Sequence, residues 1–183
     1  MFTIALMHFT YAQDKEYLNA IEQWHKMRID YLKKPDGWLN LEGLFWLKKG
    51  KNSFGSDAKA DCHYDNKDFP SMLGNFIYQG DSVIWENGNQ AFIDIDKVKA
   101  TPGMPYKVFD EYGNAAVMDW KQFSWVVIKR EDKVGIRFRN LNAKTLIAFK
   151  GIERFPVESK WHIKAKLIQP AQDFLMITNV LGQ

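Results

Sequence analysis

The sequence lacks the residues on which several common classes of protein depend. Cys62 is the only cysteine among 183 residues, which excludes an intramolecular disulfide and a zinc site built from cysteines. No run of about 18 apolar residues occurs, so we predict no transmembrane segment. The chain also lacks a Gly-x-Ser-x-Gly elbow, a P-loop and a dinucleotide-binding fingerprint, and nothing in it implies a cofactor.

Strong charge of one sign is absent as well. The net charge is +3, and lysines are interspersed with acidic residues along the whole chain without forming a basic block. Proteins that bind nucleic acids usually carry such a block as an electrostatic footprint. We therefore predict no nucleic-acid partner.

Aromatic side chains are abundant, at 15% of the residues. The densest stretch is 34–57, KPDGWLNLEGLFWLKKGKNSFGSD. After Gly37 apolar positions alternate and then run continuously through Leu44–Leu47, which is typical of a strand that enters a core. Glycine-bearing corners are expected at Lys48–Asn52 and Phe54–Asp57. We interpret these aromatics as core residues rather than as a ligand-binding loop, because aromatic side chains bury the most area per residue.

The segment 13–34 is predicted to form one helix. Apolar residues recur from Asp14 to Lys33 at the i, i+3, i+4, i+7 spacing of a helix face. Asp14 is placed to cap the first turn, and Pro35-Asp36-Gly37 ends the helix. The predicted face consists of Tyr17, Ile21, Trp24, Arg28 and Tyr31.

The rest of the chain, 35–183, is predicted to be a β-domain. The clearest hairpin is FSWVVIK-RED-KVGIRFR, in which Val134, Ile136 and Phe138 share one side. The later predicted strands are Asn75–Gln79, Ser82–Glu86, Ala91–Ile95, Tyr106–Phe109, Phe123–Lys129, Lys133–Arg139, Thr145–Phe149, Trp161–Ile168 and Asp173–Val180. One helix followed by many strands favours a mainly β fold, in which the N-terminal α-helix docks on an antiparallel β-sandwich or open-barrel-like domain.

Residues 1–12 have features of a truncated signal peptide. A short apolar run, Phe2–Met7, precedes Thr10-x-Ala12, which fits the small-residue rule for a signal-peptidase site and makes Gln13 the first mature residue. This pattern predicts a periplasmic or secreted protein. In the alternative, residues 1–12 are an apolar arm packed on the domain, and the protein is cytoplasmic.

Four residues are candidates for ligand binding. Arg28 shares its predicted helix face with aromatic residues, so it is either a stacked structural residue or an anchor for an anion. Arg137 and Arg139 share one face of the hairpin and form either a solvated surface or an anion-binding platform. Trp38, in the aromatic stretch, is the fourth candidate. The ligand indicated is a small anionic or carbohydrate molecule, with a protein partner as the alternative.

A weaker candidate is the metal site suggested by the segment DCHYD. In an extended conformation Asp61, His63 and Asp65 face one side, and two carboxylates with an imidazole suit Zn²⁺ or Mn²⁺. The spacing matches no specific metal motif, and the alternative is a polar edge strand. Cys62 is not expected to act as a nucleophile with His63, because adjacent strand residues point to opposite faces.

A set of short motifs runs through the chain. They are Trp24-x-x-x-Arg28, Pro35–Leu39, Gly43–Leu47, Gly50–Asp57, Val134–Arg137, Phe149-x-Gly151, Arg154–Val157 and Asn179–Gly182. Together, over Glu16–Gln183, they resemble the bacterial and archaeal family called domain of unknown function 1684. The resemblance implies no established reaction or ligand. It does imply export signals or lipoprotein anchors in many relatives, and a second half beyond the Asn-Val-Leu-Gly stretch. From this resemblance we expect the β-domain 35–183 to have a C-terminal continuation that is missing here.

These observations leave three functions open. The first is an extracytoplasmic module that binds a small ligand or a partner protein. The second is the incomplete half of a hydrolase-like enzyme, so enzymatic activity stays an open question. The third is a purely structural or interaction domain. A pocket lined by arginine and tryptophan would favour the first function, and an exposed apolar sheet edge near Gln183 would favour the second.

Overall fold

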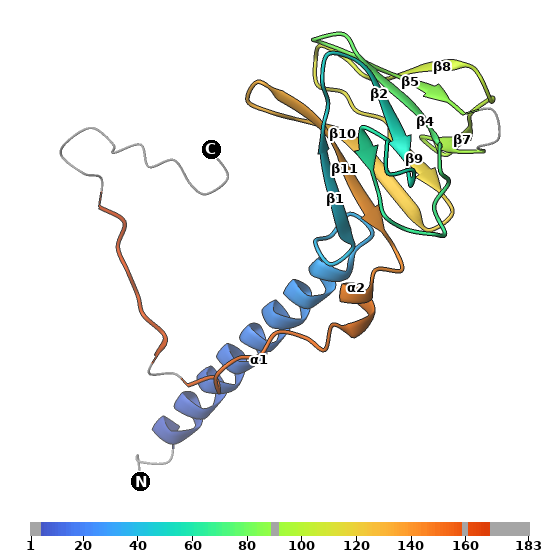
Figure 1. The fold of residues 1–183 in the computed structure, drawn as a ribbon. Helices are drawn as coiled ribbons and strands as arrows, with labels where there is room; N and C mark the ends of the chain where they lie inside the picture. Colours follow the sequence, from blue (N-terminus) through green and yellow to red (C-terminus); the bar gives the residue numbers. More distant parts are fainter. Residues whose placement is uncertain (1–4, 89–91, 159–160, 169–183) are drawn as a thin grey trace. The chain divides into compact units, whose positions relative to one another are not determined.

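The computed structural model describes residues 5–88, 92–158 and 161–168, and the chain divides into two compact units (Figure 1). The first unit comprises residues 1–25 with 153–183, and the second comprises Lys26–Ile152. Every strand of the described part lies in the second unit.

The second unit contains two sheets. The six-stranded sheet has the order β1 (Leu41–Trp46), β11 (Lys133–Asn140), β10 (Phe123–Arg130), β9 (Val117–Trp120), β6 (Asp94–Ile95) and β7 (Val98–Lys99). The five-stranded sheet has the order β3 (Cys62–His63), β2 (Gly50–Gly55), β4 (Gly74–Tyr78), β5 (Val83–Asn87) and β8 (Pro105–Phe109). Neighbouring strands are antiparallel except β2 and β3, which pair in parallel. The two sheets do not close into a barrel, and the predicted mainly β, sandwich-like fold with an N-terminal helix is confirmed.

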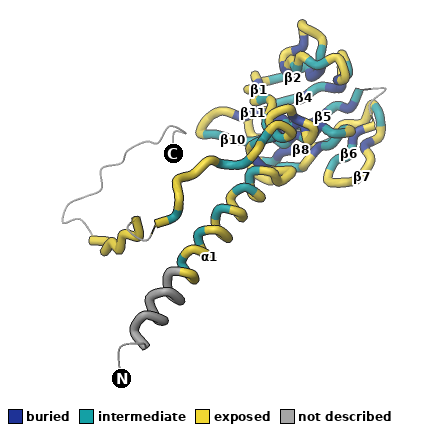
Figure 2. The backbone as a smooth tube through the Cα atoms, turned by 90° about the horizontal axis from the view of Figure 1, so that it is seen from below, coloured by how far each residue is buried: buried dark blue, intermediate teal, exposed yellow. Residues whose placement is uncertain are grey.

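Aromatic side chains from both sheets form one core. Phe54 on β2 lies at its centre, with ring centroids 5.6 Å from Phe76 and 5.5 Å from Trp125 of the opposite sheet. Trp125 in turn lies 6.2 Å from Trp85. Such pairs add roughly 0.5–1.5 kcal/mol each to the burial of the rings. The buried positions therefore concentrate in the strands, as Figure 2 shows.

Two predicted hairpins are confirmed. β4 pairs with β5 around Gly80-Asp81, and β10 pairs with β11 around Glu131-Asp132. In β11 the residues Val134, Ile136 and Phe138 are buried, as their alternation predicts. Register in such a pair is fixed by burial, because a slip of one residue would move every core side chain to the other face.

The aromatic stretch is core only in part. Phe54 is fully buried and Phe45 packs against the core, but Trp38 is 56% exposed and Trp46 is 43% exposed. The prediction that all of these rings are core residues was therefore wrong. The corners expected at Lys48–Asn52 and Phe54–Asp57 are partly occupied by β2, which runs through Gly50–Gly55. The non-strand parts that remain are Lys48–Lys49 before it and Ser56–Asp57 after it. The buried Asn52 amide donates to Lys48 O at 2.7 Å and accepts from Lys48 N–H at 2.8 Å.

Helix α1 (Ala5–Lys33) ends where Pro35-Asp36-Gly37 predicts, but it begins nine residues before Asp14. Asp14 therefore lies inside the helix and does not cap it. The half-buried stripe of its described side chains consists of Tyr17, Ile21, His25, Ile29 and Leu32. Trp24, Arg28 and Tyr31, which were predicted to share the packed face, are exposed. None of the described helices is both long and apolar enough to span a membrane.

Two predicted strands near the end of the described chain were wrong. Thr145–Phe149 largely forms a short helix, α2 (Lys144–Ala148), which is anchored where the Thr145 hydroxyl donates to Leu39 O at 2.6 Å. Trp161–Ile168 is exposed and contains no strand. Within the first unit, Arg154 forms an ion pair with Glu22, and His162 stacks on Tyr17 with ring centroids 4.8 Å apart. The strand predicted at Asp173–Val180 lies outside the described residues.

Candidate ligand site

The outer face of the six-stranded sheet carries three of the four predicted ligand residues. Phe123, Trp125 and Val127 of β10 are buried inside the sandwich, so the side chains between them point outward. The outward side chains of β1, β11, β10 and β9 are Leu44, Trp46, Arg137, Arg139, Ser124, Val126, Ile128, Val117 and Asp119. Polar and apolar residues are therefore mixed on a surface that the core does not cover.

Arg137 and Arg139 lie side by side on this face, both half-buried. The Arg137 guanidinium lies over the Trp38 ring, 6.0 Å from its centroid, within the range of a cation–π contact. Arg139 donates from Nη2 to Asp36 O at 3.2 Å. The loop after α1 thus brings Trp38 and Asp36 to the two arginines. The sequence analysis named Trp38 and the two arginines as separate candidates, and it did not predict that they lie together.

Positive charge on this face is not neutralised by its neighbours. Burial is the largest cause that lowers the pKa of Arg137, and the nearby Arg130 lowers it further. Burial likewise lowers the pKa of Arg139, the charge of Arg137 adds to this effect, and Asp36 opposes it. Both groups still stay protonated at neutral pH. Among the described residues, no ion pair joins either arginine to a carboxylate.

A hollow lies beside Arg139. Its volume is about 370 Å³. Its lining residues are Pro35, Asp36, Val117, Asp119, Ser124, Val126, Arg139 and Leu141. The Nε–H of Arg139 is buried and has no hydrogen-bond acceptor. A buried donor without an acceptor destabilises a protein by about 1–3 kcal/mol. Arg139 also lines the hollow, where a ligand would meet its positive charge.

The fourth predicted ligand residue, Arg28, is not part of this arrangement. Arg28 is exposed on α1 and does not line the hollow beside Arg139. Of the predicted helix face to which it was assigned, Tyr17 and Ile21 are half-buried, whereas Trp24 and Tyr31 are exposed as Arg28 is. The structure therefore groups Arg137, Arg139 and Trp38 and leaves Arg28 apart from them.

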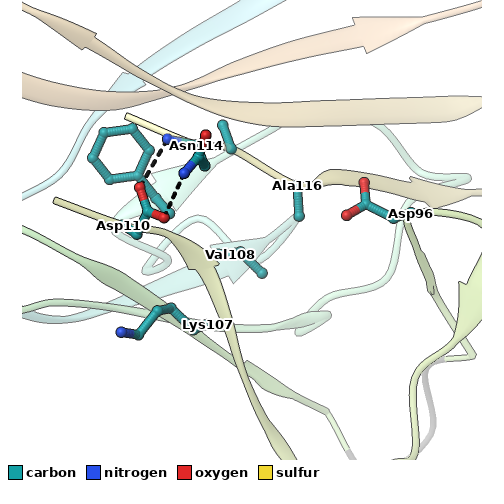
Figure 3. Close-up of a pocket in the computed structure, with 8 residues that line it drawn as sticks. Asp96, Lys107, Val108, Asp110, Asn114 and Ala116 are labelled. Atoms are coloured by element: carbon teal, nitrogen blue, oxygen red, sulfur yellow. Dashed lines mark hydrogen bonds between the residues drawn. The ribbon is translucent and has the colours of Figure 1, made fainter. Parts of the chain in front are cut away.

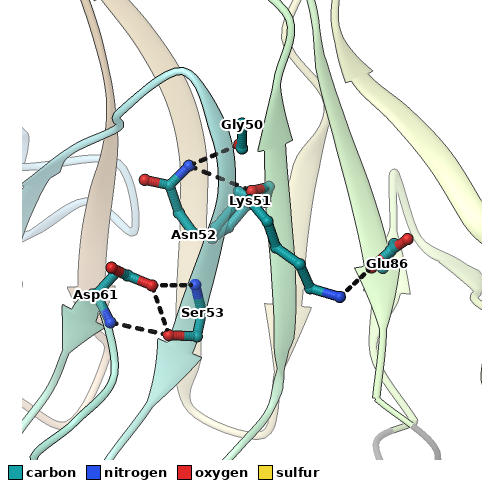
Figure 4. Close-up of polar contacts among 7 residues, drawn as sticks. Gly50, Lys51, Asn52, Ser53, Asp61 and Glu86 are labelled. Atoms are coloured by element: carbon teal, nitrogen blue, oxygen red, sulfur yellow. Dashed lines mark hydrogen bonds and ion pairs between the residues drawn. The ribbon is translucent and has the colours of Figure 1, made fainter.

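The predicted metal ligands alternate as expected but do not assemble into a site. Asp61, His63 and Asp65 are exposed, with the buried Cys62 between the first two. One Asp61 oxygen accepts from Ser53 N–H at 2.9 Å and from the Ser53 hydroxyl at 2.8 Å (Figure 4). The backbone hydrogen bond is the main cause that lowers the pKa of Asp61. In the described part of the chain, no three His, Cys, Asp or Glu side chains are grouped to hold a metal ion.

A second hollow, of about 230 Å³, lies near the loop after β8 (Figure 3). The two carboxylates that line it, Asp110 and Asp96, already accept hydrogen bonds from other residues of the chain. Asp110 accepts from Asn114 N–H at 2.9 Å and from the Asn114 side-chain amide at 2.8 Å, and these bonds lower its pKa. Asp96 accepts from Val117 N–H at 2.9 Å. Asp110 therefore closes a turn and Asp96 binds the backbone of β9, so this hollow offers a ligand less than the one beside Arg139.

Three residues of the candidate site were missed by the sequence analysis. Asp119 was not singled out, because β9 is short and its pairing with β10 has no local signal. Ser124 lies in the predicted strand Phe123–Lys129 and was overlooked there. Arg130 lies at the end of β10 and follows the outward alternation of Ser124, Val126 and Ile128. The alternation of buried and outward residues in the hairpin was the one signal in the sequence that could have identified Ser124 and Arg130 as outward-facing.

No protein-family model matches the chain, and no curated protein matches it significantly. The resemblance to domain of unknown function 1684 stays a prediction that rests on the motifs of the sequence.

Proposed function

We propose that this chain is a ligand-binding β-domain, exported from the cytoplasm, that binds a small anion on the outer face of its six-stranded sheet. The observation that supports this proposal is the pair Arg137 and Arg139. Two half-buried guanidinium groups lie together without an ion pair, and the Nε–H of Arg139 lacks an acceptor. A carboxylate or phosphate would neutralise this charge and accept hydrogen bonds from the guanidinium N–H groups in the forked geometry that arginine favours.

The binding experiment uses the ¹⁵N-labelled full chain. Acetate, succinate and inorganic phosphate are titrated at constant ionic strength, and the amide shifts of β10 and β11 are followed. We expect saturable shifts with at least one of the three anions. We expect Arg137→Ala combined with Arg139→Ala to weaken binding at least tenfold, since one bidentate charged contact is worth about 1.5–3 kcal/mol.

Lys129→Ala is the matched control for that experiment. Lys129 lies on β10 and carries the same charge, but its position alternates with the outward residues. Its loss should leave the affinity unchanged. The proposal is wrong if none of the anions gives saturable shifts, or if the double arginine variant binds as well as the unchanged chain.

An interaction domain is the second candidate, and exposed apolar side chains at one sheet edge favour it. β1 has a strand partner on one side only. Its side chains Leu44 and Trp46 are 50% and 43% exposed, and Trp38 is 56% exposed. Apolar residues grouped in this way often mark contacts with another protein. No observation within the described residues favours the hydrolase alternative.

Export rests on the Thr10-x-Ala12 motif and needs its own test. The N-terminal residue of the protein recovered from its native cells should be Gln13. A protein that begins at Met1 and remains in the cytoplasm would contradict export and leave the ligand site unaffected.

A further inference from the structure

Polar side chains form a straight row across the outer face of the six-stranded sheet. Arg139 is paired with Ser124, and Ser124 is paired with Asp119. Asp119 is paired with Asp94 on β6. Residues paired in this way on successive strands lie on the same face of a sheet. The row therefore places a cation at one end, a hydroxyl in the middle and carboxylates at the other end.

One strand separates Arg139 from Asp119 in this row. Adjacent strands are about 4.8 Å apart, so the backbones of Arg139 and Asp119 are separated by roughly 10 Å. Among the described residues, neither side chain takes part in an ion pair. The intervening position is Ser124, whose small side chain leaves room above the sheet.

The hollow beside Arg139 contains the whole centre of this row. Arg139, Ser124 and Asp119 all line it, and its volume is about 370 Å³. The remaining lining is mostly apolar and consists of Pro35, Val117, Val126 and Leu141, together with Asp36. Two carboxylates in the lining disfavour a ligand with several negative charges. They favour a ligand that brings a positive group of its own.

We infer that the ligand is a small zwitterion with an apolar body, such as an apolar α-amino acid, which deepens the proposed function and rests on it. Its carboxylate binds the Arg139 guanidinium and the Ser124 hydroxyl. Its ammonium group binds Asp119, and its hydrocarbon part covers the apolar lining. This arrangement pairs both Arg139 and Asp119, and an anion without an amine would pair only Arg139.

Three molecules of matched shape separate the contributions of the ligand's carboxylate and ammonium group to the binding affinity. L-leucine carries both charged groups, 4-methylpentanoate lacks the amine, and 3-methylbutylamine lacks the carboxylate. Each is titrated into the ¹⁵N-labelled full chain at constant ionic strength, and dissociation constants are obtained from the amide shifts of Ser124 and its neighbours. We expect L-leucine to bind at least tenfold more tightly than either partial molecule.

Asp119→Asn provides the decisive comparison, with a dispersed amide spectrum as the check that the variant folds. This change should weaken L-leucine to the level of 4-methylpentanoate and should not weaken 4-methylpentanoate. Asp68→Asn, which removes an exposed carboxylate from the other half of the sandwich, should change neither. If 4-methylpentanoate binds as tightly as L-leucine, or Asp119→Asn leaves the difference intact, the zwitterion is wrong and the anion site stands. If none of the three molecules binds in a way that depends on Arg139, the zwitterion is wrong, and the anion titration decides separately on the proposed function.

Discussion

At the scale of single residues, Cys62 is a core side chain rather than a reactive thiol. Cys62 is 1% exposed and belongs to the hydrophobic core. Burial is the largest cause that raises the pKa of its thiol from 9.0 to about 12, and the charge of Asp61 contributes to the increase. Thiolates, not thiols, are the nucleophiles in cysteine chemistry. His63 is exposed and follows Cys62 directly, so it is not placed to act as its base.

This pKa predicts slow modification of Cys62 by 5,5′-dithiobis(2-nitrobenzoate). At pH 8 a thiol with a pKa of about 12 is roughly a thousandfold less ionised than a free cysteine with a pKa of about 8.5. The folded chain should react at least a thousandfold more slowly than the same chain in concentrated guanidinium chloride. Its rate should rise about tenfold per pH unit from 8 to 10, because the pKa lies above this range. A plateau near pH 9 would show an ordinary, accessible thiol.

The same shift has a defined sign for stability. The folded pKa lies above the unfolded value, so the folded chain holds a proton that the unfolded chain releases. Ionisation therefore favours unfolding. The contribution of Cys62 to the free energy of unfolding is fully present below about pH 9 and decreases as the pH rises toward 12.

At the scale of elements, the turn of the β10–β11 hairpin contains a strained residue. Arg130 pairs with Lys133, so the loop consists of Glu131 and Asp132. Glu131 has φ +54°, a left-handed conformation that side chains with a Cβ disfavour. Two-residue hairpin turns adopt such angles because they match the twist of the strands.

Glu131→Gly is expected to stabilise the fold by about 0.5–1 kcal/mol, because glycine adopts positive φ without steric conflict. Asp132→Gly is the control. Asp132 is not among the residues with positive φ, so glycine there gives only a more flexible unfolded chain and lower stability. Urea unfolding followed by tryptophan fluorescence measures both variants. Equal destabilisation by the two changes would contradict the role assigned to Glu131.

The elements that could be predicted from the sequence are those with a local signal. The β4–β5 and β10–β11 hairpins were found because alternation and turn residues occur within one short segment. Thr145–Phe149 was predicted as a strand because it is apolar and short, and such segments do not distinguish helix from strand by period alone. The hydrogen bond of Thr145 to Leu39, 106 positions away in the chain, has no local signal.

The residues of the candidate site could likewise be predicted only where a local sequence signal exists. Arg137 and Arg139 could be assigned to one face because both lie in a strand of clear alternation. Trp38 was recognised as a candidate, but its contact with Arg137 depends on the path of the loop after α1. Asp119 and Ser124 join the site through strand pairing, which sequence periodicity does not specify. Arg28 was predicted to lie on the packed face of the helix, but it is exposed. Aromatic residues at helical spacing indicate that they share one face of a helix, and they do not indicate whether that face is buried.

At the scale of the whole molecule, the buried core lies entirely within the second unit, Lys26–Ile152. Its buried residues run from Asn40 to Ala143 and include residues of both sheets and the aromatic centre around Phe54. In the first unit, no described side chain is buried, and Phe155 and Leu167 are 90% and 95% exposed. A chain of this length with one continuous core satisfies the usual size for independent folding.

The fragment Lys26–Ile152 is therefore expected to fold alone. It keeps the last turns of α1, both sheets and α2, and with them every buried side chain of the described chain. Urea unfolding of the fragment should be a single cooperative transition, with the same midpoint by tryptophan fluorescence and by circular dichroism. Phe54→Ala in the fragment should lower the free energy of unfolding by about 3–5 kcal/mol, since Phe54 fills the centre of the core. A fragment that unfolds without cooperativity, or that tolerates Phe54→Ala, would mean that the core of the second unit is not sufficient to specify the fold.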